Sequence, residues 1–223
     1  MGEKRSRQLL AVHMENARRL LDDFLSDHGI GLDVLGKAME QFCQTVFELP
    51  EDAVCRPGCA YCCSLRVGVS IPELLVIFYE LKAQAHPEVL AALKARIFEI
   101  SSQGNLLEED FWRSTQQACP FLNDQGCCII YGFRPFSCRA YHSTDRKICQ
   151  RGYEEKKEVQ VPCFPLYRAT TDMYSSVFIK VLGDKGFASF QVSLVKGLDI
   201  LFKDEGASAR WLGKKNVFLD AKI

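Results

Sequence analysis

Apolar side chains recur at helical spacing along most of this 223-residue chain. Residues three and four positions apart share one face of a helix, so this spacing predicts amphipathic helices. The pattern covers residues 5–27, 32–48, 88–102, 166–182 and about 188–203, with a weaker stretch over 106–117. In the first helix the residues expected to face inward include Leu9, Val12, Ala17, Leu20 and Phe24. Trp211 follows the last helix and is expected to begin a short tail.

A capping box predicts the start of another helix at Ser70. Glu73 lies three residues after Ser70, so each side chain can hydrogen-bond the backbone amide of the other residue, and Pro72 suits the first turn. Residues 74–81 are apolar almost all round, and a helix without a polar face is buried. We therefore expect a buried helix that anchors the segment preceding it.

Two stretches, residues 51–69 and 119–163, have no helical period and contain most of the cysteines. Within them only CCIIYGF, residues 127–133, resembles a strand, and it is short. The predicted fold is mainly α, with helices packed around an irregular cysteine-rich metal-binding loop region. We expect a single domain over residues 1–223, in which a metal-binding core of about 51–163 lies between helical flanks at 1–50 and 164–223.

Composition limits the functions open to this chain. Lys and Arg number 28, Asp and Glu also number 28, and the formal net charge is zero. This balance gives no electrostatic reason to expect nucleic acid or an anionic membrane as a partner. No stretch approaches the about 18 apolar residues of a membrane span. The expected partner is a protein or substrate whose identity the sequence does not reveal.

Eleven cysteines are the exception in an otherwise ordinary composition. The odd number argues against a complete disulfide framework, and the N-terminal segment lacks the apolar run of a signal peptide. We therefore expect a cytoplasmic protein. In a reducing cytosol, clustered cysteines indicate metal binding or catalysis more often than disulfides.

The first cysteine stretch reads CRPGCAYCC and places Cys55, Cys59, Cys62 and Cys63 within nine residues. Pro57 and Gly58 predict a tight turn between the first two. The second stretch, CPFLNDQGCCIIYGFRPFSCRAY, contributes Cys119, Cys127, Cys128 and Cys138. Thiolates favour Zn(II), Fe(II) and iron–sulfur clusters, so we expect the two stretches to meet around metal. Arg134 and Arg139 flank Cys138 and would offset the negative charge of the thiolates.

These elements resemble the CxxCxxCC, or YkgJ-like, family of zinc- or iron-chelating domains. The resemblance rests on the paired cysteines that end the first stretch, on the CPFL sequence at 119–122, and on CIIYGFRPFSCR at 128–139. It departs at the start, where three residues rather than two separate Cys55 from Cys59. The resemblance implies eight metal-chelating cysteines, which here are Cys55, Cys59, Cys62, Cys63, Cys119, Cys128, Cys138 and Cys163. Cys43, Cys127 and Cys149 are left over, Cys149 is the nearest rival of Cys163, and His142 is a candidate nitrogen ligand.

Three functions are compatible with this ligand set. The first is a metal-binding protein in which zinc or iron joins the two loops. The second is an iron–sulfur enzyme, because flagellin lysine-N-methylase is similar in carrying this type of cysteine domain, which implies SAM-dependent methyl transfer. The third is cysteine-based redox chemistry or metal handling. No strand–helix alternation, glycine-rich SAM segment or nucleophile elbow supports a particular enzyme, so catalysis stays an open question.

Overall fold

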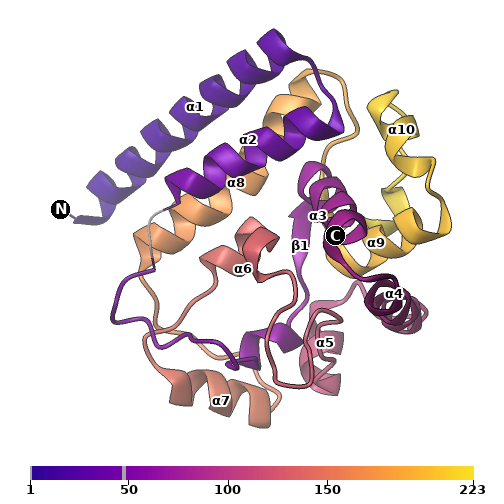
Figure 1. Ribbon diagram of the computed structural model, residues 1–223. Helices are drawn as coiled ribbons and strands as arrows, with labels where there is room; N and C mark the ends of the chain where they lie inside the picture. The colour runs from indigo at the N-terminus through magenta and orange to yellow at the C-terminus, as the bar shows by residue number, and fades with distance from the viewer. Residues whose placement is uncertain (1, 47–48) are drawn as a thin grey trace.

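A computed structural model describes residues 2–46 and 49–223 and confirms a mainly α fold (Figure 1). Over these residues there are ten α-helices and one two-stranded sheet. Most of the predicted helices are present with ends shifted by a few residues. The helix predicted over about 188–203 begins only at Leu194, because residues 191–193 form a strand. The helix predicted over 32–48 ends at Thr45, and residues 47 and 48 lie outside the described ones. The elements are α1(Gly2–His28), α2(Leu32–Thr45), η1(Tyr61–Ser64), β1(Gly68–Ser70), α3(Ile71–Gln84), α4(Pro87–Ser101), α5(Glu109–Thr115), η2(Tyr131–Phe133), α6(Phe136–Ala140), α7(Arg146–Glu154), α8(Pro165–Asp184), β2(Gln191–Ser193), α9(Leu194–Lys203), α10(Ala207–Leu212) and η3(Leu219–Ala221), where η denotes a 3₁₀ helix.

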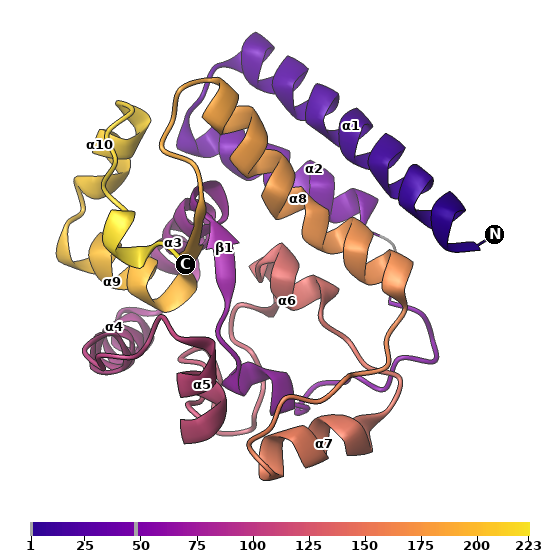
Figure 2. The same ribbon diagram turned by 180° about the vertical axis from the view of Figure 1, so that it is seen from behind.

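The two longest helices, α1 and α8, lie side by side at the edge of the molecule (Figures 1 and 2). The face of α1 that is buried carries Ala17, Leu21 and Leu25. The prediction that Leu9, Val12 and Leu20 face inward is wrong, because they are 54%, 60% and 65% exposed. Their helical face also carries Asn16, Asp23 and Asp27, which could be buried only at the cost of desolvating two carboxylates.

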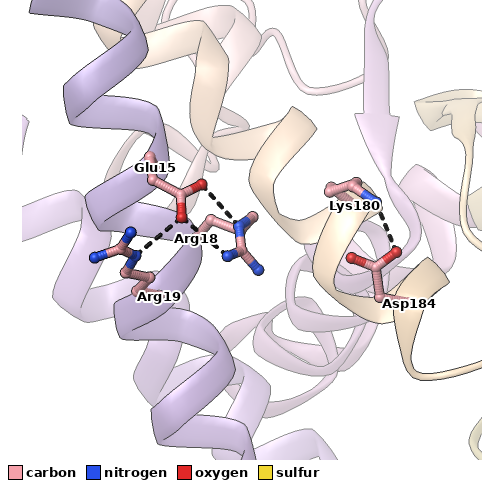
Figure 3. A network of polar contacts seen from close by, with 5 residues as sticks. All are labelled: Glu15, Arg18, Arg19, Lys180 and Asp184. Carbon is pink, nitrogen blue, oxygen red and sulfur yellow. Dashed lines mark hydrogen bonds and ion pairs between the residues drawn. The ribbon is translucent and has the colours of Figure 1, made fainter.

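Both helices carry ion pairs between charged side chains of the same helix (Figure 3). On α1, Glu15 pairs with Arg18 and Arg19 at N···O distances of 2.9 Å. On α8, Lys180 pairs with Asp184 at 2.7 Å. These are pairs at three- and four-residue spacing on exposed helix surfaces, and such pairs add only tenths of a kcal/mol each.

Helix α3 is buried, as its apolar sequence predicts. Its residues Leu74, Leu75 and Ile77 have no exposed surface. The capping box is present: the Ser70 hydroxyl accepts from the Glu73 amide, and the Glu73 carboxylate accepts from the Ser70 amide. Helix α3 contacts α2, α8 and α9, so it joins the N-terminal and C-terminal helices of the chain.

The sheet consists of two strands that sequence periodicity did not predict. Strands β1 and β2 pair antiparallel, with Gly68 opposite Ser193 and Ser70 opposite Gln191. Each strand has three residues, which is too short for an alternating pattern to be recognised. The pairing matters because it fixes the chain just after the first cysteine stretch to the C-terminal part of the core.

Residues 119–163 contain more helix than expected. Helices α6 and α7 lie in this region, and the strand predicted over 127–133 is wrong, because η2 occupies Tyr131–Phe133. Helix α7 does carry a start signal, since the Asp145 side chain accepts from the Lys147 amide at 2.8 Å. The apolar residues of CCIIYGF belong to a tight turn rather than a strand.

The C-terminal tail is part of the core. Trp211 lies in α10, has no exposed surface, and donates its indole N–H to the Ala188 carbonyl at 2.7 Å. The expectation of a tail beginning at Trp211 is therefore wrong. Buried apolar residues from all parts of the chain form one cluster, and no helix in the described residues is long and apolar enough to cross a membrane.

Candidate metal centre

The first cysteine loop is shaped by the predicted tight turn. Pro57 and Gly58 are its central residues, and the Cys59 amide closes it by donating to the Arg56 carbonyl at 3.0 Å. Gly58, the third residue of this four-residue turn, has φ +81°. A left-handed value at that position is typical of a type II turn, and glycine adopts it without steric cost. The turn reverses the chain between Cys55 and Cys59.

Cys62 and Cys63 follow as adjacent residues in η1. The Leu65 amide donates to the Cys62 carbonyl at 3.2 Å and ends this 3₁₀ turn. Strand β1 begins four residues after η1 and leads directly into α3. The first loop is thereby attached to the most buried helix of the protein.

The second loop begins with a small hairpin. The Asn123 amide donates to the Cys127 carbonyl and the Ile129 amide to the Phe121 carbonyl, both at 2.9 Å. This pairing returns the chain so that Cys127 and the following Cys128 come back alongside the segment that starts at Cys119. Phe121 is 1% exposed, so the hairpin is fixed to the core by an aromatic side chain.

Helix α6 carries Cys138 and is held in place by a carboxylate of α3. The Phe136 amide, at the start of α6, donates to Glu73 Oε1 at 2.9 Å. The other carboxylate oxygen of Glu73 accepts from the Ser70 amide, the Ser70 hydroxyl and the Ser175 hydroxyl. Glu73 therefore links three parts of the chain at one buried point. They are Ser70 at the start of α3, Ser175 in α8, and α6, which carries Cys138.

The two loops meet directly. The Cys119 amide donates to the Cys63 carbonyl at 2.7 Å, although the two residues lie far apart in sequence. Both loops line one cavity of about 510 Å³. Its cysteines are Cys55, Cys59, Cys62, Cys63, Cys119, Cys127, Cys128 and Cys138. Seven of the eight predicted ligands thus share this cavity, and Cys163 does not line it.

Cys62 lies within electrostatic reach of other cysteines of the site. A negative charge on Cys62 would raise the pKa values of Cys55, Cys119, Cys128, Cys138 and Cys149. The neighbouring Cys63 thiol, followed by removal from water, raises the pKa of Cys62 itself. Cys62 is therefore a thiol that ionises with difficulty when no cation is nearby.

Removal from water raises the pKa of other thiols in this cavity as well. It raises the pKa of Cys138 to about 12 and also raises that of Cys119, with smaller contributions from neighbouring cysteines. In the metal-free protein these groups are neutral thiols at neutral pH. A cation that binds them must displace their protons.

The donor set fits a thiophilic metal in its chemistry. Thiolates select Zn(II), Fe(II) and iron–sulfur clusters over Mg²⁺ or Ca²⁺. Among the residues that the structure describes, however, no three His, Cys, Asp or Glu side chains converge closely enough to hold one ion. Binding would therefore require several of the thiols that line the cavity to move closer together.

Two further cysteines lie outside the cavity lining. Cys149 is in α7, which contacts η1. Cys163 directly precedes Phe164, the N-cap residue of α8. Cys43, on α2, lines a separate groove of about 570 Å³ that also contains Arg139. This position agrees with the packing role that its sequence context suggests.

Both ring nitrogens of His142 are occupied by protein partners. Nε2 accepts from the Phe164 amide and Nδ1 lies against the Ala140 carbonyl, both at 2.8 Å. Because an amide can only donate, Nε2 carries no proton and Nδ1 donates its own. The ring is 1% exposed and stacks on Phe164 with centroids 5.5 Å apart. His142 is therefore a structural residue in this conformation rather than a free nitrogen ligand.

Sequence reasoning missed two residues that shape the site. Cys127 lines the cavity beside Cys128, and the Asn123-to-Gly126 turn signal indicates a hairpin that returns both of them. Glu73 was recognised only as a helix cap. Its bond to Phe136 joins residues 63 positions apart, and no local pattern predicts such a contact.

The cavity brings soft sulfur donors from two loops together at its wall, a donor set typical of sites for thiophilic metals. Residues 54–163 match the family CxxCxxCC, described as "Putative zinc- or iron-chelating domain". The chain therefore carries a domain of the CxxCxxCC family, as the sequence resemblance implied. No curated protein and no solved structure matches the chain.

Proposed function

We propose that this protein binds zinc or iron through thiolates of its cysteine-lined cavity. The observation that carries the proposal is the convergence of two sequence-distant cysteine loops on one cavity of about 510 Å³. The ligands are drawn from seven cysteines that line it: Cys55, Cys59, Cys62, Cys63, Cys119, Cys128 and Cys138. Bound zinc would join the two loops and stabilise the fold, whereas iron would add redox chemistry.

For the eighth ligand, the contacts of α7 favour Cys149 over Cys163. Arg146 and Tyr153 both lie against the ring of Tyr61 in η1, at 5.7 Å and 5.8 Å. Cys149 lies three residues after Arg146 and four before Tyr153, so it shares the helix face that meets η1. Cys163, the eighth cysteine that the family resemblance implies, is the competing candidate. Cys149→Ser and Cys163→Ser variants distinguish the two candidates, because metal content falls only when the cysteine that binds metal is replaced.

The test of metal binding is elemental analysis with an absorption spectrum, on protein purified without oxygen or added metal. A zinc-to-protein molar ratio near a whole number, with no visible absorbance, supports a zinc-chelating protein. Iron with acid-labile sulfide and a violet-region band supports the iron–sulfur alternative, for which SAM binding is then measured. Protein that contains no metal and takes up neither zinc nor iron refutes the proposal.

Variants test the ligand assignment itself. Cys62→Ser and Cys138→Ser should lower both metal content and stability, because each removes a thiolate from a shared centre. Cys43→Ala is the matched control, since Cys43 lines the separate groove, and it should keep full metal content and lose only packing energy. Full metal occupancy in Cys62→Ser or Cys138→Ser would remove that residue from the ligand set.

A reducing compartment suits this chemistry. All eleven cysteines are free thiols in the structure, and thiols in this number persist where glutathione and thioredoxin keep them reduced. We therefore propose a cytoplasmic location, with a protein partner or substrate as the unidentified second component. Fractionation of cells that express the tagged protein tests the location.

A further inference from the structure

Arg134 has an unusual position in the cavity wall. It lies between η2 and α6, and its side chain lines the cysteine cavity. Its guanidinium lies 4.1 Å from the centroid of the Tyr131 ring. This stacking fixes the plane of the guanidinium, because the planar cation rests on the face of the aromatic ring.

The Nε–H of Arg134 is a buried donor without an acceptor. Over the described residues, only two buried side-chain nitrogen or oxygen atoms lack a hydrogen-bond partner, and the other is the Ser189 hydroxyl oxygen. A hydroxyl can rotate toward a nearby acceptor, whereas the direction of an Nε–H is set by the guanidinium plane. A buried, unpaired donor on a charged group is costly, so its acceptor is expected to arrive with something that enters the cavity.

Thiols of the cavity lie within electrostatic reach of this guanidinium. Among the thiols with which Arg134 interacts electrostatically are Cys62, Cys128 and Cys138. A neutral thiol is a weak acceptor, but a metal-bound thiolate is negatively charged and accepts well. Four thiolates around one divalent ion leave a net charge of −2, which a nearby guanidinium would partly neutralise.

Arg139 belongs to the same short sequence motif but faces other partners. Its Nε donates to the Arg134 carbonyl at 3.0 Å and its Nη2 donates to the Gly132 carbonyl at 2.5 Å. It lines the groove on α2 and α3 rather than the cysteine cavity. Arg139 thus closes the turn that carries Arg134, and two of its donors are used in doing so.

We propose that Arg134 is the charge-compensating positioning residue of the metal centre, whose Nε–H donates to a metal-bound thiolate, while Arg139 serves only to hold the loop. This inference rests on the proposed metal-binding function. It predicts that the two arginines flanking Cys138 are not equivalent: loss of Arg134 weakens metal binding, and loss of Arg139 weakens the fold.

The test compares Arg134→Met and Arg134→Lys with the control Arg139→Met. Affinity for Zn(II) and Co(II) is measured by competition with a chelator, and thermal unfolding is recorded for the metal-free and zinc-loaded forms. Arg134→Met should bind both ions about 10–100-fold more weakly, as is typical when a hydrogen-bond partner of a ligand is removed. Arg134→Lys should recover part of this loss, because it restores the charge but not the planar donor.

Two readouts separate this role from a purely structural one. The thiolate-to-cobalt charge-transfer band of Arg134→Met should move to lower energy, because a thiolate that has lost a hydrogen bond is a stronger donor. The metal-free Arg134→Met protein should unfold close to the wild-type temperature, because loss of the stacking on Tyr131 is offset by removal of an unpaired buried donor. Arg139→Met should show the reverse: near wild-type affinity and a lower unfolding temperature without metal.

Wild-type affinity in Arg134→Met, or an equal loss of affinity in Arg139→Met, would overturn the inference while leaving metal binding intact. Failure of the wild-type protein to bind Zn(II), Co(II) or iron would instead refute the proposed function, and the role of Arg134 with it.

Discussion

Replacing Glu73 should uncouple the cysteine site from the helical scaffold. Its carboxylate is fully buried and accepts from two backbone amides, Ser70 and Phe136, each at 2.9 Å, and from two serine hydroxyls. The hydroxyls can turn to other acceptors, but the two amides are fixed by the backbone. In Glu73→Ala both amides lose this acceptor.

The expected cost follows from those two amides. A buried donor left without a partner costs about 1–3 kcal/mol, so two of them give roughly 2–6 kcal/mol for Glu73→Ala. Glu73→Gln keeps one carbonyl oxygen and therefore leaves one amide unpaired, at about 1–3 kcal/mol. Glu88→Gln, on the exposed first turn of α4, is the matched control and should change stability very little.

The assay is urea unfolding at neutral pH combined with amide hydrogen exchange. The free energy of unfolding should fall in the order wild type, Glu73→Gln, Glu73→Ala. Exchange at the Phe136 amide should accelerate in both variants, because this amide has lost its acceptor or competes for a single one. A Glu73→Ala protein that is as stable as Glu88→Gln, with protected Phe136, would refute the reasoning.

Three further predictions concern the core, the site and the surface. Trp211→Phe should lower the free energy of unfolding by about 2 kcal/mol, measured by urea denaturation, because it leaves the Ala188 carbonyl unpaired and opens a void; an unchanged midpoint would contradict the buried position of α10. His142→Phe should cost about 1–3 kcal/mol of stability but keep full metal content by elemental analysis, because both ring nitrogens bond to the backbone; loss of metal at unchanged stability would make His142 a ligand. Zinc affinity should fall as the pH is lowered from about 8 to about 6, because burial raises the pKa of Cys138 to about 12 and binding must release its proton; a pH-independent affinity would mean that the bound thiols are already ionised in the metal-free protein.

The helical class and the membership of the cysteine family are readable in the sequence, for local reasons. Amphipathic spacing and the Ser70–Glu73 capping box involve residues within one or two turns of a helix, and such interactions act before any tertiary structure forms. The Pro57–Gly58 turn is likewise decided by the φ preferences of its two residues. These features therefore appear in the structure where the sequence predicts them.

Two of the errors involve choices that depend on a distant partner. The inward face of α1 is selected by α8, which buries the row of Ala17, Leu21 and Leu25 instead of the apolar residues Leu9, Val12 and Leu20. Strand β1 exists only because β2 pairs with it from more than a hundred residues away. A short segment has too weak a preference of its own to indicate that pairing.

Local patterns therefore predict the helices, the turn in the first loop, and the thiols able to chelate a soft metal. They do not predict which thiols share one cavity, that both ring nitrogens of His142 bond to the backbone, or that Arg134 lines the cysteine cavity while Arg139 lines another groove. Local conformational preferences act over a few residues, whereas burial and hydrogen-bond satisfaction are settled when α3, α6 and the two loops pack against one another.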